Sequence, residues 1–292
     1  MVAESARHTS LMGLLVPRSL VWATDIDALP LDHTVERRQQ GHLAVRSPGN
    51  PGHYWGTLLV FDDPPTPGDR ERWEAFFDEA FGDDPRVRHR TFAWDRTGGD
   101  PGDAEEEFVQ HGYRLDDSVA LVADSSGVRR HLRENRAVEV RVLDATEGAD
   151  AELWQQVIEM EVAGRDPELT QEEYRTYLEA RHADRRKLFR AGRGAWYVAT
   201  DPGSGEVVAS CGIVVAAGRG RFQAVETSAP YRRRGICSRL VVEAARHAVD
   251  VHGATQLVIV ADAGYHALGL YESLGFERRE HVFGVSLWPE PR

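Results

Sequence analysis

The sequence predicts an α/β fold with a mixed sheet, organised as two domains. The chain has 292 residues, which is more than one compact domain usually holds. In its C-terminal half, strand-like runs alternate with helical patterns, as is typical of α/β layers. A charged and polar stretch, residues 129–136, precedes a new alternating pattern that starts at Val138. We therefore expect one domain over residues 1–137 and a second over residues 138–292.

The C-terminal half carries the clearest secondary-structure patterns. They predict, in chain order, strand 138–143, helices 148–163 and 170–190, strands 195–200, 206–217 and 220–228, helix 235–252, strand 256–261, helix 264–273 and a last strand from residue 280. Helix 235–252 is the best defined, because its apolar residues recur at helical spacing. The turn Asp201-Pro-Gly-Ser-Gly205 predicts a hairpin between two of the strands.

The N-terminal half shows weaker patterns. They predict a strand over residues 57–61 and a helix over residues 70–81. The Gly- and Asp-rich residues 97–103 predict a mobile loop.

A short sequence pattern occurs once in each half of the chain. Phe108 is followed four residues later by Gly112-Tyr113, and Tyr271 is followed four residues later by Gly275-Phe276. A strand-like run follows each of these pairs. A recurrence of this kind suggests a duplicated domain. An unrelated α/β domain is the alternative for the N-terminal half.

The composition excludes several classes of partner. Forty-seven acidic and 35 basic residues give a net charge of −12, so nucleic acid and anionic membrane surfaces are not expected partners.

Two cysteines, Cys211 and Cys237, are too few for a disulfide framework and should be free thiols in a reducing compartment. The apolar run Leu11–Val16 is shorter than the core of a signal peptide, and residues 207–218 are too few to span a membrane. We therefore expect a cytoplasmic protein.

The most informative stretch of the sequence is a basic turn between a strand and the long helix. It consists of Arg232, Arg233, Arg234 and Gly235, and the helix opens with Ile236, Cys237 and Ser238. Free backbone N–H groups, the positive end of a helix and arginine side chains together favour phosphate oxygens. Glycine at this position would let the backbone approach a pyrophosphate closely. The alternative is an arginine-rich turn that only solubilises the start of the helix.

Other chemistries find little support in the sequence. The single lysine, Lys187, excludes a Gly-x-x-x-x-Gly-Lys phosphate loop. His247 and His252 lie five residues apart on a helix and should point to different faces, so no metal site is expected. Gly203-Ser204-Gly205 is a turn rather than a nucleophile elbow.

The basic turn and a later helix together resemble the GNAT superfamily of acyl-CoA-dependent N-acyltransferases. Arg232-Arg-Arg-Gly235-Ile-Cys237 matches the family's Gln/Arg-x-x-Gly-x-Gly/Ala loop, with cysteine in place of the last small residue. Leu270-Tyr271-Glu-Ser-Leu-Gly275-Phe276 matches the family's second motif. Gly264 stands where many members carry asparagine. The resemblance covers residues 138–292 and implies an acyl-CoA-binding fold with acetyl-CoA as co-substrate.

The resemblance also implies roles for individual residues. Tyr271 would donate a proton to the departing CoA thiolate, and backbone N–H groups from Val225 to Thr227 would bind the thioester carbonyl. An amine acceptor with a pKa near 10.4 must be deprotonated, and Glu226 is the nearest acidic candidate for the base. Asp262 and His266 are the alternatives.

These features predict an N-acetyltransferase that acts on a primary amine of a small molecule or peptide by direct attack in a ternary complex. A non-catalytic acyl-CoA sensor or a structural tandem module is the alternative. The N-terminal half has Phe108 in place of the tyrosine and lacks the Arg-x-x-Gly spacing, so we expect a degenerate, catalytically silent domain. The sequence leaves the acceptor, and a possible homodimer, undetermined.

Overall fold

The computed structural model describes residues 16–289, which form two compact units. The first unit comprises residues up to 119 together with residues from 280, and the second comprises residues 120–279. Two strands, β5 (Arg114–Asp124) and β11 (Glu277–Leu287), cross from one unit into the other. The final strand of the chain therefore supplies part of the first unit. Of the apolar run Leu11–Val16, all but Val16 lies outside the described residues.

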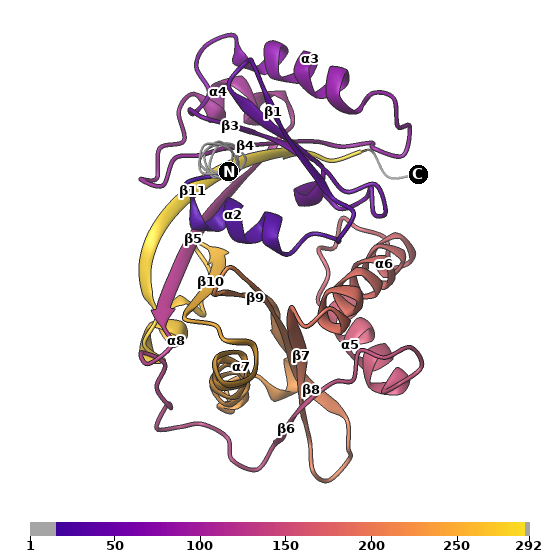
Figure 1. The fold of residues 1–292 in the computed structure, drawn as a ribbon, viewed down its shortest axis with the longest axis vertical. Helices are drawn as coiled ribbons and strands as arrows, with labels where there is room; N and C mark the ends of the chain where they lie inside the picture. The colour runs from indigo at the N-terminus through magenta and orange to yellow at the C-terminus, as the bar shows by residue number, and fades with distance from the viewer. Residues whose placement is uncertain (1–15, 290–292) are drawn as a thin grey trace, which may run out of the picture. The chain divides into compact units, whose positions relative to one another are not determined.

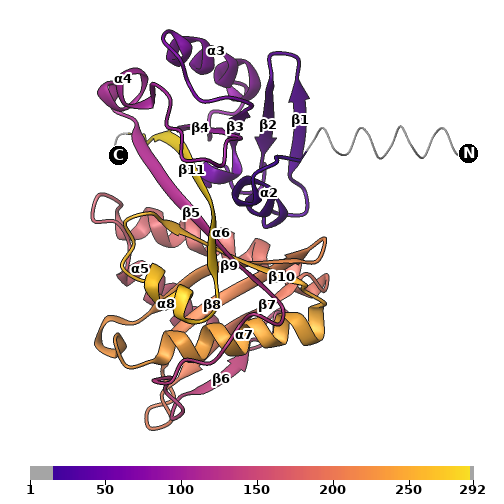
Figure 2. The same cartoon turned by 90° about the vertical axis from the view of Figure 1, so that its left-hand side faces the viewer.

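The first unit contains an antiparallel meander followed by a parallel crossover. Its elements are α2 (Leu20–Asp27), β1 (Thr34–Arg38), β2 (His42–Arg46), the 3-10 turn η1 (Tyr54–Gly56), β3 (Leu58–Phe61), α3 (Asp69–Phe81), β4 (Arg90–Trp94), α4 (Ala104–Glu107) and the 3-10 turn η2 (Val109–His111). Neighbouring strands follow the order β1-β2-β3-β4-β11. Pairing is antiparallel except between β3 and β4, which α3 connects. Figure 2 shows α3 running alongside this sheet.

Aromatic side chains fill the core of the first unit. Trp73 of α3 stacks on Phe61 with ring centroids 3.7 Å apart, and Phe92, Trp94 and Phe108 surround it. All five are buried. Such rings bury large apolar areas, which explains why one short helix is enough to cover this face of the sheet.

The second unit also has antiparallel strands followed by a helix-linked parallel pair, but two helices connect its first two strands. Its elements are β6 (Glu139–Val142), α5 (Ala151–Ala163), α6 (Gln171–Arg190), β7 (Gly194–Thr200), β8 (Val207–Ala216), β9 (Arg219–Thr227), the 3-10 turn η3 (Ala229–Tyr231), α7 (Ile236–His252), β10 (Gln256–Asp262) and α8 (Leu268–Ser273). Neighbouring strands follow the order β10-β9-β8-β7-β6. Strands β6 to β9 form an antiparallel meander, and α7 connects the parallel pair β9 and β10.

Helices cover both faces of the meander in the second unit (Figure 1). Adjacent residues of β7 point to opposite faces, as in any strand. Trp196 packs on Trp154 of α5 and His182 of α6, whereas the hydroxyl of Tyr197 lies 3.0 Å from Nδ1 of His247 on α7. All seven residues of β7 are buried for this reason.

The predicted elements of the C-terminal half are all present, with boundaries shifted by a few residues. The largest difference is at α8, which starts at Leu268 because residues 263–267 form turns after β10. In the N-terminal half, strand 57–61 and helix 70–81 are confirmed, but β1, β2 and β4 were not predicted. Residues 97–103 form a loop, in which Gly99 and Thr97 exchange backbone hydrogen bonds with His281 of β11. Among residues 16–289, no helix combines the length and apolar character needed to cross a membrane.

Candidate active site

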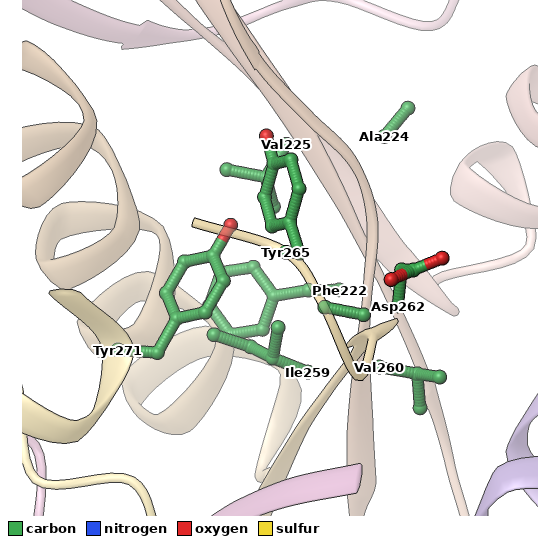
Figure 3. A pocket seen from close by; sticks show the side chains of 9 residues that line it. Phe222, Ala224, Val225, Ile259, Val260, Asp262, Tyr265 and Tyr271 are labelled. Carbon is green, nitrogen blue, oxygen red and sulfur yellow. The ribbon is translucent and has the colours of Figure 1, made fainter. Parts of the chain in front are cut away.

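A cavity opens in the second unit where β9 and β10 separate. The two strands pair in parallel at Arg219–Gln256, Gly220–Leu257 and Arg221–Val258, although they continue to Thr227 and Asp262. Beyond these pairs, backbone groups of both strands face the gap instead of each other. The gap holds a cavity of about 240 Å³ lined by Phe222, Ala224, Val225, Ile259, Val260, Ala261, Asp262, Tyr265 and Tyr271 (Figure 3).

A β-bulge in β9 sets which side chains face this cavity. Gln223 lies opposite Gly212 and Glu226 lies opposite Ser210, so two residues of β9 face one residue of β8. Ala224, within the bulge, has a φ of 43°, which is unusual for a residue other than glycine. The extra residue inverts the alternation, so that Val225 lines the cavity as Phe222 does. Glu226 consequently points to the same face as Gln223, the face that α5 and α6 cover.

The carboxylate of Glu226 lies against the C-terminal end of α5. A Cβ added to Gly164, the C-cap residue of this helix, would overlap Oε1 of Glu226. Burial, together with the nearby carboxylate of Glu161, raises the pKa of Glu226 to about 7, although Arg232 opposes the shift. The last carbonyl groups of a helix carry partial negative charge and also disfavour a carboxylate there. The carboxylate of Glu226 can therefore accept a proton near neutral pH.

Two tyrosines stand on the wall of the cavity. Tyr271 projects from α8 and is buried, and Tyr265 projects from the turn before it. Figure 3 shows both rings on the side of the cavity where Val225 lies, whereas Asp262 and Ala224 lie on the other side. Burial raises the pKa of both phenols above their usual value, so both hydroxyl groups keep their protons at neutral pH. Each can act as a hydrogen-bond donor into the cavity.

Backbone geometry leaves further donors beside the cavity. The N–H of Ser228 donates to the carbonyl of Val208 on β8. Because successive N–H groups of a regular strand alternate in direction, that of Thr227 points away from β8 and toward the gap. The carbonyl of Thr227 points the same way and accepts a hydrogen bond of 3.0 Å from Nε of Arg232.

The basic turn lies at the start of α7. Gly235 caps this helix with a φ of 73° and without a side-chain capping bond, so the first N–H groups of α7 have no partner within the helix. Arg232, Arg233 and Arg234 are exposed, and the guanidinium of Arg234 lies 5.2 Å from the ring centre of Tyr231. Ile236 and Ser238 are buried, which anchors this end of the helix. The turn thus presents positive charge and free donors.

The structure explains why glycine occupies one position in each of the two motifs, and the explanation differs from the one that the sequence suggested. A Cβ at Gly235 would overlap the carbonyl oxygen of Arg133, and a Cβ at Gly275 would overlap that of Gly127. Asn135 also donates its N–H to the carbonyl of Gly235. The charged stretch at residues 129–136 therefore runs along α8 and the start of α7, and both glycines make room for the backbone before and within it.

Only some of the residues predicted for the site line this cavity. Val225, Tyr271 and Asp262 line it, Glu226 lies on the opposite face of β9, and His266 is exposed and packs on the ring of Tyr265. Sequence reasoning missed Tyr265, whose position just after β10 was the available signal. It also missed the apolar lining residues Phe222 and Ile259, which look like ordinary strand core.

None of the cysteines and histidines of this unit lines the cavity. Cys211 and Cys237 are free thiols, as expected, and burial raises the pKa of Cys237 to about 12. The expectation that His247 and His252 point to different faces is wrong, because their rings lie 5.4 Å apart at the last turn of α7. Over residues 16–289, no group of three or more His, Cys, Asp or Glu side chains is arranged to hold a metal ion.

The corresponding place in the first unit has no such opening. Strands β3 and β4 pair from Leu59–Phe92 to Phe61–Trp94, and Asp95 adds a further hydrogen bond of 2.8 Å to the carbonyl of Phe61. The strands stay paired to the end of β3. The stacked rings of Phe61 and Trp73 lie on the sheet at this point.

Comparison with known proteins identifies relatives of this arrangement. Residues 154–276 match the acetyltransferase (GNAT) family. No curated protein matches the sequence. A conserved protein of unknown function from Staphylococcus epidermidis has a similar structure, with a TM-score of 0.67, 13% identity and coverage of 90% of this chain and 96% of its own.

Two further structures share the fold. A GCN5-related N-acetyltransferase from Kribbella flavida has a TM-score of 0.58 at 15% identity, over 90% of this chain and 91% of its own. A tandem GNAT protein from the clavulanic acid biosynthesis pathway has a TM-score of 0.55 at 14% identity, over 94% of this chain and 91% of its own. At these identities, the likeness establishes the fold only.

Proposed function

Residues 154–276 form a domain of the GNAT acetyltransferase family, and from this premise we propose that the protein transfers an acetyl group from acetyl-CoA to a primary amine of a small molecule or peptide. The family supports acyl transfer from an acyl-CoA, and the residues around the cavity support the finer assignment. The pantetheine arm would enter between β9 and β10, where the strands separate. Its pyrophosphate would bind the free N–H groups at the start of α7 and the arginines Arg232 to Arg234.

The site residues divide the reaction into three tasks. The N–H groups of Val225 and Thr227 would bind the thioester oxygen and stabilise its negative charge in the tetrahedral intermediate. Glu226, directly or through water, would take the proton of the acceptor ammonium so that its nitrogen can attack the carbonyl carbon. The C–N bond forms, the C–S bond breaks, and the hydroxyl of Tyr271 donates a hydrogen bond to the departing sulfur. The second proton of the attacking nitrogen passes through water to the thiolate, which leaves as free CoA thiol.

The observation that carries this proposal is the separation of β9 from β10 with Tyr271 on the wall of the resulting cavity. A strand pair that remained closed, as β3 and β4 do, would leave no room for a pantetheine arm. The bulge at Ala224 adds a second argument, because it places the proposed base and the proposed sulfur-binding group on opposite sides of β9. The acceptor nitrogen attacks one face of the planar thioester, so the group that takes its proton and the group that binds the sulfur occupy different positions around the carbonyl carbon.

A direct test uses purified protein, acetyl-CoA and a panel of primary amines. We expect acetylated product, identified by mass spectrometry, together with an equal amount of free CoA. Glu226→Gln should lose most of the activity at neutral pH and keep its affinity for acetyl-CoA. If the protein binds acetyl-CoA but no amine is acetylated, the proposal fails and a non-catalytic acyl-CoA-binding protein is the better description.

We propose that the first unit is a degenerate, catalytically silent relative of the second. It has the same succession of an antiparallel meander and a helix-linked parallel pair. It has Phe108 where the second unit has Tyr271, and its parallel strands leave no gap. Its own contribution to catalysis would then be limited to supporting the second unit.

A further inference from the structure

The segment between β5 and β6 contacts both α8 and α7, and we call residues 127–136 the strap. Near its start, the N–H of Arg129 donates to the carbonyl of Leu274, the C-cap residue of α8, at 2.9 Å. Near its end, the N–H of Asn135 donates to the carbonyl of Gly235, also at 2.9 Å. The strap thus joins the end of α8 to the basic turn at the start of α7.

Ion pairs hold the second half of the strap on α7. The side chain of Glu134 is 2% exposed, and its carboxylate lies among three arginines. Arg130 and Arg136 of the strap lie 2.9 and 3.1 Å from it, and Arg239 of α7 lies 3.7 Å from it. Glu243 of α7 binds both Arg130 and Arg239. Removing the Glu134 charge would leave three cations with one remaining carboxylate, so this charge keeps the strap in place.

The hydrogen bond from Asn135 fixes the orientation of one peptide group at the start of α7. The carbonyl of Gly235 and the N–H of Ile236 belong to the same planar trans peptide, so they point in opposite directions. The strap binds the oxygen of this peptide, which also accepts from the N–H of Arg239 at 3.3 Å. The N–H of Ile236 has no acceptor within the helix and therefore points away from the strap. In the proposed function, this N–H is one of the donors to the pyrophosphate.

The backbone of the strap also packs closely on Gly235. A Cβ at Gly235 would overlap the carbonyl oxygen of Arg133 and would lie 3.0 Å from the backbone nitrogen of Asn135. A rotation of the Gly235–Ile236 peptide would therefore break the hydrogen bond and meet the strap. A donor that is already oriented raises affinity, because the ligand does not have to order it on binding.

We propose that the strap is part of the acetyl-CoA site, with Glu134 and Asn135 as positioning residues that orient the N–H of Ile236 toward the pyrophosphate. The inference rests on the proposed function, because that function places the pyrophosphate at the start of α7. Neither side chain touches acetyl-CoA in this scheme. By thermodynamic reciprocity, acetyl-CoA stabilises the closed strap by the same factor by which the closed strap strengthens acetyl-CoA binding.

The first experiment compares acetyl-CoA binding to Glu134→Gln and to the unmodified protein by isothermal titration calorimetry. The variant keeps the shape of the side chain but releases the arginines, so its Kd should rise about 3- to 10-fold, the contribution of one hydrogen bond. The direction discriminates, because loss of a negative charge near a phosphate site would by itself lower the Kd. KM for acetyl-CoA should rise with the Kd, whereas kcat should not change. Glu159→Gln, which breaks an ion pair with Arg175 outside the strap, should leave the Kd unchanged.

Two variants at position 135 isolate the main-chain donor. Asn135→Pro removes the N–H that binds Gly235 and should also raise the Kd about 3- to 10-fold. Asn135→Ala keeps this N–H and loses only the side-chain contact with the N–H of Ala137, so its Kd should match that of the unmodified protein. Equal values of Kd in the two variants would refute the role of the main-chain hydrogen bond.

Hydrogen exchange in the unmodified protein tests the same coupling without a substitution. Saturating acetyl-CoA should slow exchange of the Asn135 amide about 3- to 10-fold. The amide of Asp95, which donates to the carbonyl of Phe61 in the first unit, should not respond. An Asn135 amide that acetyl-CoA leaves unaltered, or a Kd that does not rise in Glu134→Gln, would overturn the inference.

The same measurements separate this inference from the proposed function. If acetyl-CoA binds with the expected coupling but no amine is acetylated, the transfer activity falls and the role of the strap stands. If amines are acetylated and the strap variants bind acetyl-CoA normally, the role of the strap falls alone. A protein that binds no acetyl-CoA would refute both.

Discussion

The hydroxyl of Tyr271 offers the sharpest test of the proposed chemistry, because Tyr271→Phe removes one oxygen and keeps the ring that lines the cavity. An ordinary phenol has a pKa of about 10 and an ordinary thiol about 8.5, so complete proton transfer to the thiolate is uphill by roughly 2 kcal/mol. Burial raises the pKa of Tyr271 further. The structure therefore favours a hydrogen bond to the developing thiolate over complete transfer.

The size of the effect on kcat follows from the strength of this hydrogen bond. A hydrogen bond to a charged acceptor contributes roughly 1.5–3 kcal/mol, which corresponds to a fall in kcat of about 10- to 150-fold. The bond strengthens only as the C–S bond breaks, so KM for acetyl-CoA should change little. The assay is steady-state release of CoA thiol at saturating amine, with melting temperature as the check on folding.

Tyr113→Phe is the matched control. Tyr113 is also a buried tyrosine, but its hydroxyl bonds to Glu74 in the first unit, 2.9 Å away, so kcat should be unchanged. A loss of more than about 10⁴-fold in Tyr271→Phe would mean that complete proton transfer is essential, contrary to the reasoning from burial. A kcat equal to that of the unmodified protein would remove Tyr271 from the mechanism.

Three other predictions concern stability and binding. Gly235→Ala should destabilise the fold by at least about 2 kcal/mol in urea denaturation, because it combines a positive φ with an overlap on the carbonyl of Arg133. Gly253 has a similar φ but no neighbouring atom within 4 Å, so Gly253→Ala should lower the free energy of unfolding by only about 1 kcal/mol. Equal losses of stability in the two variants would refute the role of the overlap. Folding raises the pKa of Glu226 from 4.5 to about 7, so the unmodified protein loses stability as pH rises through this window. The melting temperature of Glu226→Gln relative to the unmodified protein should therefore be higher at about pH 8 than at about pH 4, and a pH-independent difference would contradict the shift. Calorimetry should find a single acetyl-CoA per chain, whereas two would show that the first unit also binds it.

The local sequence was sufficient for the elements of the second unit and for the basic turn that precedes α7. The helical spacing of apolar residues marked α7, and the run of arginines before Gly235 marked the start of that helix. Both patterns lie within a single helix and its cap, so they can be recognised from residues that are close together in the sequence. The first unit was harder to predict, because β1 and β2 are short and only β2 is buried along its length.

The sequence by itself determined the succession of strands and helices, the basic turn and the tyrosine that follows it, because periodicity and turn chemistry act between close neighbours. The tertiary structure decided how these parts form a site. The bulge at Ala224 depends on the pairing of β9 with β8. Because of the bulge, Glu226 points to the face of β9 opposite to the one that strict alternation along the sequence would give it. The proton affinity of Glu226 depends on burial and on Glu161, which is 65 positions away in the chain. Long-range packing creates both effects, and no local pattern encodes them.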